Sequence, residues 1–214
     1  MNHSIIKPNF VILTGGQSVR MQQDKAFVKI GKNSTFLTRL LKKLKYFNGN
    51  IYFSLRQNQI QEYSELIQNP NFLVDQNIPA YGPLKGILST YSYFSKKKNI
   101  EHLFFLPVDI PFVKLRTINR LLQINLKSKT KLPGVFYESS TGLEPLCGIY
   151  SMEVLSKWYN SIISKVTNDF SLQKRIICLN PKPYILKLPI DEEFNFRNIN
   201  TKEDLQKTRQ DETN

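Results

Sequence analysis

The residues best suited to chemistry lie in the segment 13–25, LTGGQSVRMQQDK, which directly follows an apolar run. Glycine permits backbone conformations that are closed to other residues, so Gly15 and Gly16 predict a loop whose bare amides can approach a phosphate. Arg20 and Lys25 follow closely. An arginine can grip two phosphate oxygens at once, and a lysine adds a mobile point charge. The segment therefore predicts a site for a nucleoside triphosphate.

The glycine pair does not match the two best-known phosphate-binding motifs. A Walker A loop needs four residues between its glycines and then Gly-Lys-Ser or Gly-Lys-Thr, and a dinucleotide fold needs Gly-x-Gly-x-x-Gly. A tight turn without a ligand remains an alternative for the pair alone. The two cations that follow it favour the phosphate site.

A second candidate is Asp109, in the segment LPVDIPF. It follows an apolar run and lies between Pro107 and Pro111, which would stiffen its loop. An aspartate in this position either caps a helix or binds a ligand. Mg²⁺ prefers hard oxygen ligands, often one or two carboxylates together with substrate phosphates. We therefore predict that Asp109 binds Mg²⁺ as the cofactor of the site.

The elements that must position these residues follow from the hydrophobic pattern. Apolar runs rich in β-branched and aromatic residues alternate with longer amphipathic stretches. This rhythm predicts an α/β fold: one Rossmann-like, mainly parallel twisted sheet with helices on both faces. We expect strands at 9–14, 50–55, 71–75, 101–109, 133–137, 143–151 and 182–188, and helices at 34–47, 58–68, 83–96, 114–125, 152–163 and 201–210.

Two helix starts and the domain plan complete this prediction. Ser34 is expected to cap the first helix, and Thr201 the last, with Asp204 closing a capping box. We expect a single domain over residues 1–214. About residues 1–112 would form its nucleotide-binding half, and about 113–214 its acceptor-binding half.

The topology should bring together the polar and glycine-rich segments that follow the predicted strands. Ligands of open parallel sheets bind beyond the carboxyl ends of the strands. The segments 15–25, 75–86 and 107–111 follow the first, third and fourth predicted strands. They are distant in sequence, but we expect them on one rim of the sheet.

Composition excludes several classes of protein. The 214 residues can bury a real core, and 41% hydrophobic with 22% charged residues is wrong for a disordered chain. No apolar run is long enough to cross a membrane, and the start MNHSIIKPNF lacks the apolar core of a secretory signal. We expect a cytoplasmic protein without a membrane partner. Cys147 and Cys178 lie far apart, and we expect both to be buried rather than to share a metal.

The net charge of +13 has two readings. The lysines gather in small clusters that fit solvated helix faces and helix C-termini, but a basic surface could also attract polyanions. Recognition of nucleic acid would favour aromatic residues interleaved with the cations on an exposed sheet. The aromatic residues here mostly follow core periodicity. We therefore expect no nucleic-acid partner, and a basic non-enzymatic nucleic-acid module remains only a remote alternative.

The motifs together resemble one family. LTGGQSVRMQQDKAFVKIGK is similar to the opening of the molybdenum cofactor guanylyltransferases, which read Leu-Ala-Gly-Gly, then Arg-Met-Gly, then Asp-Lys, within the sugar-nucleotidyltransferase-like superfamily. The similarity continues in the family's order and spans most of the chain. Its further segments are VDQNIPAYGPLKGI (74–87), LPVDIP (106–111), EPLCGIY (144–150) and FRNINTKEDL (196–205).

The resemblance implies a reaction and the roles of several residues. The family transfers GMP from GTP to the terminal phosphate of molybdopterin, yielding the guanine dinucleotide cofactor and pyrophosphate. Catalysis would fall to Arg20, Lys25 and Asp109, with Asp109 also holding Mg²⁺. The acceptor side would involve Asn198 and Asn200. The nucleotide would be bound by Leu13, Thr14, Gly15, Gly16, Lys25, Ser54, Asp75, Gly82 and Asp109.

Three positions depart from the family pattern. Thr14 replaces an alanine, Gln22 stands where a glycine follows Arg-Met, and Ser54 replaces an asparagine near the guanine or ribose. These departures leave open cytidylyl transfer to molybdopterin, or transfer to a sugar or polyol phosphate. Cytidylyltransferases of isoprenoid synthesis usually have Pro-Lys in place of Asp24-Lys25. The substrates expected from the resemblance are GTP and molybdopterin, with room for transient contact with molybdenum-insertion proteins or apo-molybdoenzymes.

Overall fold

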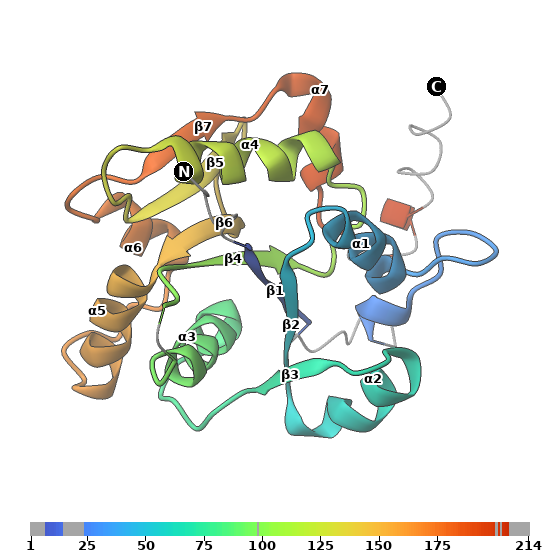
Figure 1. Cartoon of the computed structure of the whole chain (residues 1–214), viewed down its shortest axis with the longest axis horizontal. Helices are drawn as coiled ribbons and strands as arrows, with labels where there is room; N and C mark the ends of the chain where they lie inside the picture. The colour runs from blue at the N-terminus through green and yellow to red at the C-terminus, as the bar shows by residue number, and fades with distance from the viewer. Residues whose placement is uncertain (1–6, 15–23, 98, 200, 202, 206–214) are drawn as a thin grey trace, which may run out of the picture.

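The computed structural model describes residues 7–14, 24–97, 99–199, 201 and 203–205 (Figure 1). Within these residues, seven strands form one sheet in the order β3-β2-β1-β4-β6-β5-β7. The strands are β1 (Asn9–Leu13), β2 (Asn50–Leu55), β3 (Asn71–Val74), β4 (His102–Pro107), β5 (Gly134–Ser139), β6 (Gly142–Ser151) and β7 (Tyr184–Lys187).

One strand, β6, runs against the other six strands of the sheet. The strands β3, β2, β1 and β4 are parallel, whereas β6 pairs antiparallel with β4 and with β5, and β7 is parallel to β5. The carboxyl ends of the four parallel strands therefore share one edge. Because β6 runs the other way, its first residues reach that same edge. The predicted α/β fold with a mainly parallel sheet is confirmed.

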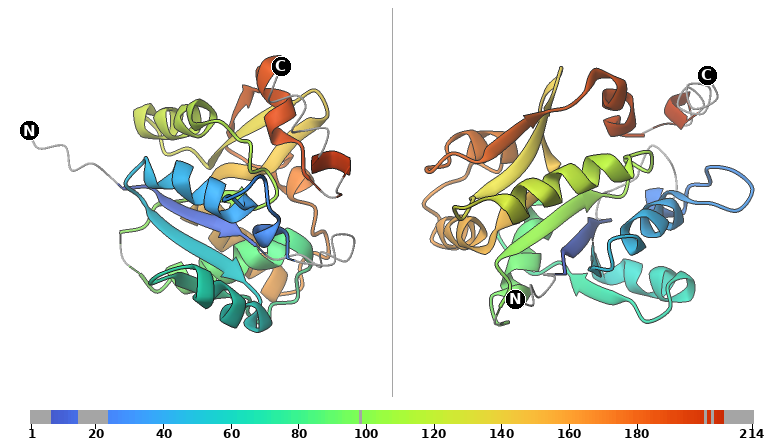
Figure 2. Two further views of the ribbon diagram at one scale, coloured as in Figure 1. Left: turned by 90° about the vertical axis from the view of Figure 1, so that its right-hand side faces the viewer. Right: turned by 45° about the horizontal axis from the view of Figure 1, so that its top comes forward.

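Helices cover both faces of the sheet. Figure 1 shows α4 and α3 on opposite sides of β4, and Figure 2 gives two further views of this arrangement. The helices are α1 (Phe36–Lys45), α2 (Ile60–Leu66), α3 (Gly82–Phe94), α4 (Leu115–Lys127), α5 (Met152–Ile163), α6 (Leu172–Ile177) and α7 (Ile190–Glu193), with 3-10 turns η1 (Lys25–Phe27), η2 (Gln57–Gln59) and η3 (Phe194–Phe196).

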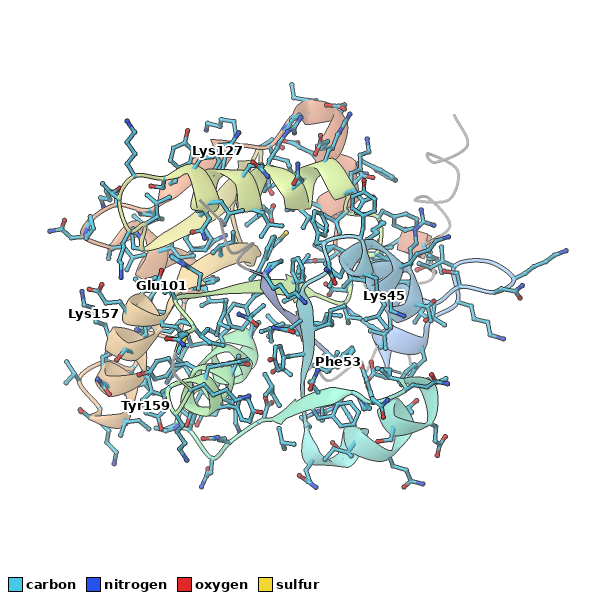
Figure 3. All side chains as sticks on the ribbon, in the orientation of Figure 1. Lys45, Phe53, Glu101, Lys127, Lys157 and Tyr159 are labelled. Carbon is cyan, nitrogen blue, oxygen red and sulfur yellow. The ribbon has the colours of Figure 1, made fainter. Side chains whose placement is uncertain are left out.

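The strand pattern explains why both faces need cover. Successive side chains of a strand point to opposite faces of a sheet. In β1, Phe10 and Ile12 pack into one core cluster with α1, α2 and α4, while Val11 and Leu13 pack into a second with α3, α5 and α6. Figure 3 shows Phe53 inside the molecule. The central strands β1 and β4 are thus buried on both sides, as their apolar runs predict.

Several boundaries differ from the sequence prediction. The first helix is capped by Thr35 rather than by Ser34, because Thr35 and Thr38 bond each other's backbone amides reciprocally. The helices α6 and α7 and the 3-10 turns were not expected. Cys147 is buried as expected, but Cys178 is exposed, so its predicted burial is wrong.

The predicted capping box near the end of the chain is present. The Thr201 hydroxyl accepts from the Asp204 amide at 3.0 Å, and the Asp204 carboxylate accepts from the Thr201 amide at 2.8 Å. Residues 206–210 of the predicted helix lie outside the described part of the chain.

Part of the basic charge lies at helix C-termini. Lys42, Lys43 and Lys45 lie in the last turn of α1, and Lys127 lies in the last turn of α4 (Figure 3). Cations are stabilised there by the helix dipole.

Among the described helices, none is both long and apolar enough to span a membrane.

A buried carboxylate binds the C-terminal segment to helix α4, which packs on the sheet. The Glu192 side chain on α7 is fully buried and lies against α4, where Thr117, Arg116 and Arg120 donate to it. A buried charge is tolerated only when it is paired and hydrogen-bonded. This cluster fixes residues 190–199 next to the edge of the sheet that holds the predicted site.

We expect Glu192→Gln to lower the free energy of unfolding by about 1–3 kcal/mol, because two arginines lose a buried charged acceptor. The matched control is Asp191→Asn, which removes the neighbouring, exposed partner of Arg116. The control should change the free energy by less than about 1 kcal/mol. Urea denaturation measures both values, and equal losses in the two variants would contradict the assigned role of the buried cluster.

Candidate active site

The carboxyl edge of the parallel strands holds a cleft of about 850 Å³. It is lined by residues that follow β1, β2, β3 and β4, so the expected convergence on one rim is observed for the described residues of the three segments, with Lys25 representing segment 15–25. Of the residues predicted from sequence, it brings together Leu13, Thr14, Lys25, Ser54, Asp75, Gly82 and Asp109. Gly15, Gly16, Arg20 and Asn200 lie outside the described residues, as does Gln22, so their roles stay predictions.

The centre of the site is an ion pair between Lys25 and Asp109. The Lys25 Nζ lies 2.8 Å from the Asp109 Oδ2, and both side chains are about one-fifth exposed, at 18% and 19%. The two residues are 84 positions apart in sequence. Partial burial weakens solvent screening, so the pair interacts more strongly than an exposed one.

Asp24 sets the position of the lysine. Its carboxylate accepts from the amide of Ala26 at 2.9 Å and so caps the short turn η1, which begins at Lys25. The same carboxylate accepts from the buried side chains of Gln59 and Tyr63. Burial and the nearby Asp24 raise the pKa of Tyr63 far above its usual value, so the phenol stays protonated and donates. The Asp24-Lys25 pair thus joins a structural anchor to a cation that lines the cleft.

Three distant segments fix the loop that holds Asp109. The Val108 amide donates to the Leu13 carbonyl at 3.1 Å, and Lys43 Nζ donates to the Pro111 carbonyl at 2.7 Å. The Ile199 amide donates to the backbone carbonyl of Asp109 at 3.1 Å. The carboxylate is therefore presented to the cleft from a constrained backbone.

The second oxygen of Asp109 bears on metal binding. Its Oδ1 is buried and has no hydrogen-bond partner among the described residues. A buried, unsatisfied carboxylate oxygen costs free energy unless a partner binds it. A hard cation such as Mg²⁺ is the partner that carboxylate oxygens suit best. The chemistry of Asp109 fits the predicted metal.

Ser54 and Asp75 form another part of the cleft. The Ser54 hydroxyl lies 3.5 Å from Asp75 Oδ1, a weak contact. Burial raises the pKa of Asp75, although Lys85, Ser54 and Arg56 oppose the shift. Gly86 lies beside them and has no side chain. A Cβ at this position would lie 2.8 Å from the Ser54 hydroxyl, which is closer than the two atoms can approach.

Thr14, a departure from the family pattern, is readily accommodated. Its hydroxyl donates to the Ser54 carbonyl at 2.7 Å, and its amide donates to the same oxygen at 3.0 Å. The added hydroxyl is therefore satisfied within the backbone between β1 and β2. The substitution leaves the wall of the cleft intact.

The first turn of α3 also borders the cleft. Gly82 adopts φ +57°, in the left-handed region that glycine adopts readily, and Pro83 follows at the start of the helix. Gly82, Pro83, Lys85 and Gly86 all line the cleft. The positive end of the helix dipole and the Lys85 side chain make this wall favourable to anions.

A second pocket of about 430 Å³ adjoins the first. Both pockets are lined by Pro107 and Leu146, so they share a wall next to Asp109. The predicted acceptor residue Asn198 lines this second pocket, next to Arg197. Ile199 follows Asn198, and its amide donates to the backbone carbonyl of Asp109. This hydrogen bond joins the segment that lines the second pocket to the loop that lines the first.

Sequence reasoning missed several residues of both pockets. In the first pocket, Arg56 and Gln57 follow directly after β2. The strand-tip rule, by which ligands bind beyond the carboxyl ends of parallel strands, could have found them. In the second, Glu144 belongs to a quoted motif without an assigned role. Glu193 and Gln173 come from short helices that gave no clear periodic signal.

Comparisons with known proteins agree on one family. A family model described as the MobA-like NTP transferase domain matches residues 10–168. The chain is similar to a protein of Clostridium perfringens named probable molybdenum cofactor guanylyltransferase, with 31% identity over 203 residues, covering 92% of this chain and 93% of that relative.

Two solved structures share the fold. Molybdopterin-guanine dinucleotide biosynthesis protein A from Archaeoglobus fulgidus aligns with a TM-score of 0.68 and 19% identity, covering 96% of this chain and 98% of that one. A 4-diphosphocytidyl-2C-methyl-D-erythritol synthase from Anaerococcus prevotii aligns with a TM-score of 0.69 and 10% identity, covering 97% of each chain. At these identities the structures establish the fold alone.

Proposed function

The chain belongs to the family of MobA-like NTP transferases, and we propose that it transfers GMP from GTP to the terminal phosphate of molybdopterin. The products are the guanine dinucleotide form of the cofactor and pyrophosphate. The observation that carries the proposal is the Lys25–Asp109 pair beside the shared wall of two pockets. One pocket is large enough for a nucleotide, and the adjoining pocket is proposed to take the acceptor.

The inventory of the site suits phosphoryl chemistry. A terminal phosphate oxygen of the acceptor attacks the α-phosphorus of GTP, a new P–O bond forms, and the bond from the α-phosphorus to the bridging oxygen of pyrophosphate breaks. The nucleophile is already anionic near neutral pH, so no strong general base is needed. Positioning and charge stabilisation are the main requirements. Lys25 offsets the negative charge that the two substrates bring together.

Asp109 is the residue that would hold the metal. When bound there, Mg²⁺ supplies the positive charge that lets two anionic phosphates approach each other. The unpartnered Oδ1 supports this role, while Oδ2 remains paired with Lys25. The hydrogen bonds that Ile199 and Lys43 donate to the loop, and the one that Val108 donates to Leu13, hold the loop so that the carboxylate keeps its direction.

The rest of the nucleotide cleft supports binding rather than bond making. The tips of β2 and β3 carry Ser54 and Asp75, which are proposed to contact the base or ribose of GTP. The division into a nucleotide-binding half and an acceptor-binding half is part of the same proposal, since Asn198 lines the second pocket. The cytoplasmic location of the protein is also part of the proposal. The basic surface would speed the encounter with two polyanionic substrates, although salt screens it over about 8 Å.

The identity of the nucleotide is the sharpest test of the function. We expect pyrophosphate release with molybdopterin, Mg²⁺ and GTP to exceed release with CTP by about tenfold or more, since a polar site can reject a base with different hydrogen-bonding groups. ATP and UTP serve as controls. Release with CTP but not with GTP would reject guanylyl transfer and leave the cytidylyl alternative.

The metal role has its own test. We expect Asp109→Asn to lower the rate of transfer by about 100-fold or more, because a preorganised charge at the reacting phosphates is lost. The amide oxygen can still accept from Lys25, so the melting temperature should stay near that of the wild type.

The matched control is Asp169→Asn, an equal change in a loop outside both pockets, which should leave the rate unchanged. Removing Mg²⁺ with EDTA should abolish transfer by the wild type, and adding Mg²⁺ back should restore it. An Asp109→Asn enzyme with normal activity would refute the role of Asp109.

A further inference from the structure

The second pocket contains a carboxylate that the proposed chemistry does not use. Glu144, near the start of β6, lines this pocket and is half-buried. Ser139 donates to its Oε1 at 2.7 Å and is its one hydrogen-bond partner among the described residues. Burial raises the pKa of this carboxyl above its ordinary value, and Glu193 raises it further. In the described part of the chain, Glu144 has no ion-pair partner.

The neighbouring acidic residue has a donor on each of its two oxygens. Both oxygens of Glu193 accept from Ser140, one from the amide and one from the hydroxyl, each at 2.6 Å. Glu144 keeps lone pairs for a ligand on both of its oxygens, since one hydroxyl donor does not exhaust the capacity of a carboxylate. It is therefore the acidic group of this pocket best placed to recognise a donor.

The charge of the pocket decides which part of an acceptor can reach Glu144. Two carboxylates, Glu144 and Glu193, line the same small volume together with one cation, Arg197, so the acidic groups outnumber the basic one and disfavour a phosphate. The phosphate of the acceptor is instead drawn toward Lys25, beyond the wall formed by Pro107 and Leu146. The uncharged, ring-bearing end of the acceptor is then left in the second pocket.

The lining of the pocket offers a ring both apolar contacts and polar partners. Ile110, Pro145, Leu146 and Phe196 supply apolar surface, and Glu144 is one of the polar groups beside them. Small-molecule sites commonly combine apolar walls with a few polar groups that fix orientation. A ring with two adjacent N–H donors on one edge matches the two oxygens of a carboxylate, and charge-assisted hydrogen bonds of this kind are among the strongest.

We propose that Glu144 selects the acceptor, accepting hydrogen bonds from the ring N–H and the neighbouring amino group of a pterin held in the second pocket. The inference rests on the proposed function, which supplies a pterin as acceptor. Guanine displays the same pair of donors, so the experiment must separate the acceptor from the nucleotide.

The test is Glu144→Gln, which turns one oxygen of the pair into a donor that opposes a ring N–H. We expect the KM for molybdopterin to rise about 10- to 100-fold, with the KM for GTP changed by less than about twofold. Glu144→Asp keeps the carboxylate and should recover part of the loss. Glu153→Gln is the matched control, because Glu153 is an exposed residue of α5 outside both pockets.

A binding measurement makes the test independent of turnover. Free pterin, which lacks a phosphate, is titrated against the wild type and the Glu144→Gln protein by its fluorescence, with guanosine as the competing probe. We expect the variant to bind pterin about 10-fold or more weakly, and guanosine to displace little pterin from the wild type.

The outcomes separate the inference from the function. Unchanged KM values in an active Glu144→Gln enzyme would overturn the role of Glu144, and so would a rise in the KM for GTP alone. If the wild type makes no dinucleotide, the proposed function fails. The pterin titration then decides the role of Glu144 by itself: unchanged binding overturns it, and weaker binding by the variant supports it.

Discussion

The structure depends on one ion pair that the chain could form only after folding. Lys25 and Asp109 meet at 2.8 Å although 84 residues separate them. Asp24 holds the lysine, and the amide of Ile199 holds the backbone of the aspartate. In the proposed function the two residues act together on two anionic substrates, because Lys25 brings charge and Asp109 leaves an oxygen for a metal. The surrounding sheet is best understood as the frame that keeps these two groups together.

The change of direction in the sheet produces the second pocket. The parallel strands place their carboxyl ends at one edge, and the larger cleft lies there. Since β6 runs antiparallel to β4, the start of β6 arrives at the same edge and brings Glu144 with it. The C-terminal segment, fastened by the buried Glu192, adds Asn198. Two adjoining pockets therefore lie beside one pair of charged residues.

The sequence predicted the parallel half better than the rest, for physical reasons. Doubly buried strands are long apolar runs, and the strand-tip rule then located Lys25, Asp75 and Asp109 without any contact information. The short helices α6 and α7 offer too few turns for a periodic signal, so their residues in the second pocket were missed. Local patterns also could not choose between the adjacent residues Ser34 and Thr35 as the N-cap of α1. The reciprocal hydrogen bonds between Thr35 and Thr38 make Thr35 the cap.

A crystal of the protein with Mn²⁺ in place of Mg²⁺ and a GTP analogue that resists transfer tests the central claim most directly, because the anomalous signal of Mn²⁺ locates the metal. We expect that signal at the carboxylate of Asp109, with the triphosphate against the ammonium of Lys25 and the base in the larger cleft. A metal bound away from Asp109, or a triphosphate that does not approach Lys25, would contradict the account of the site.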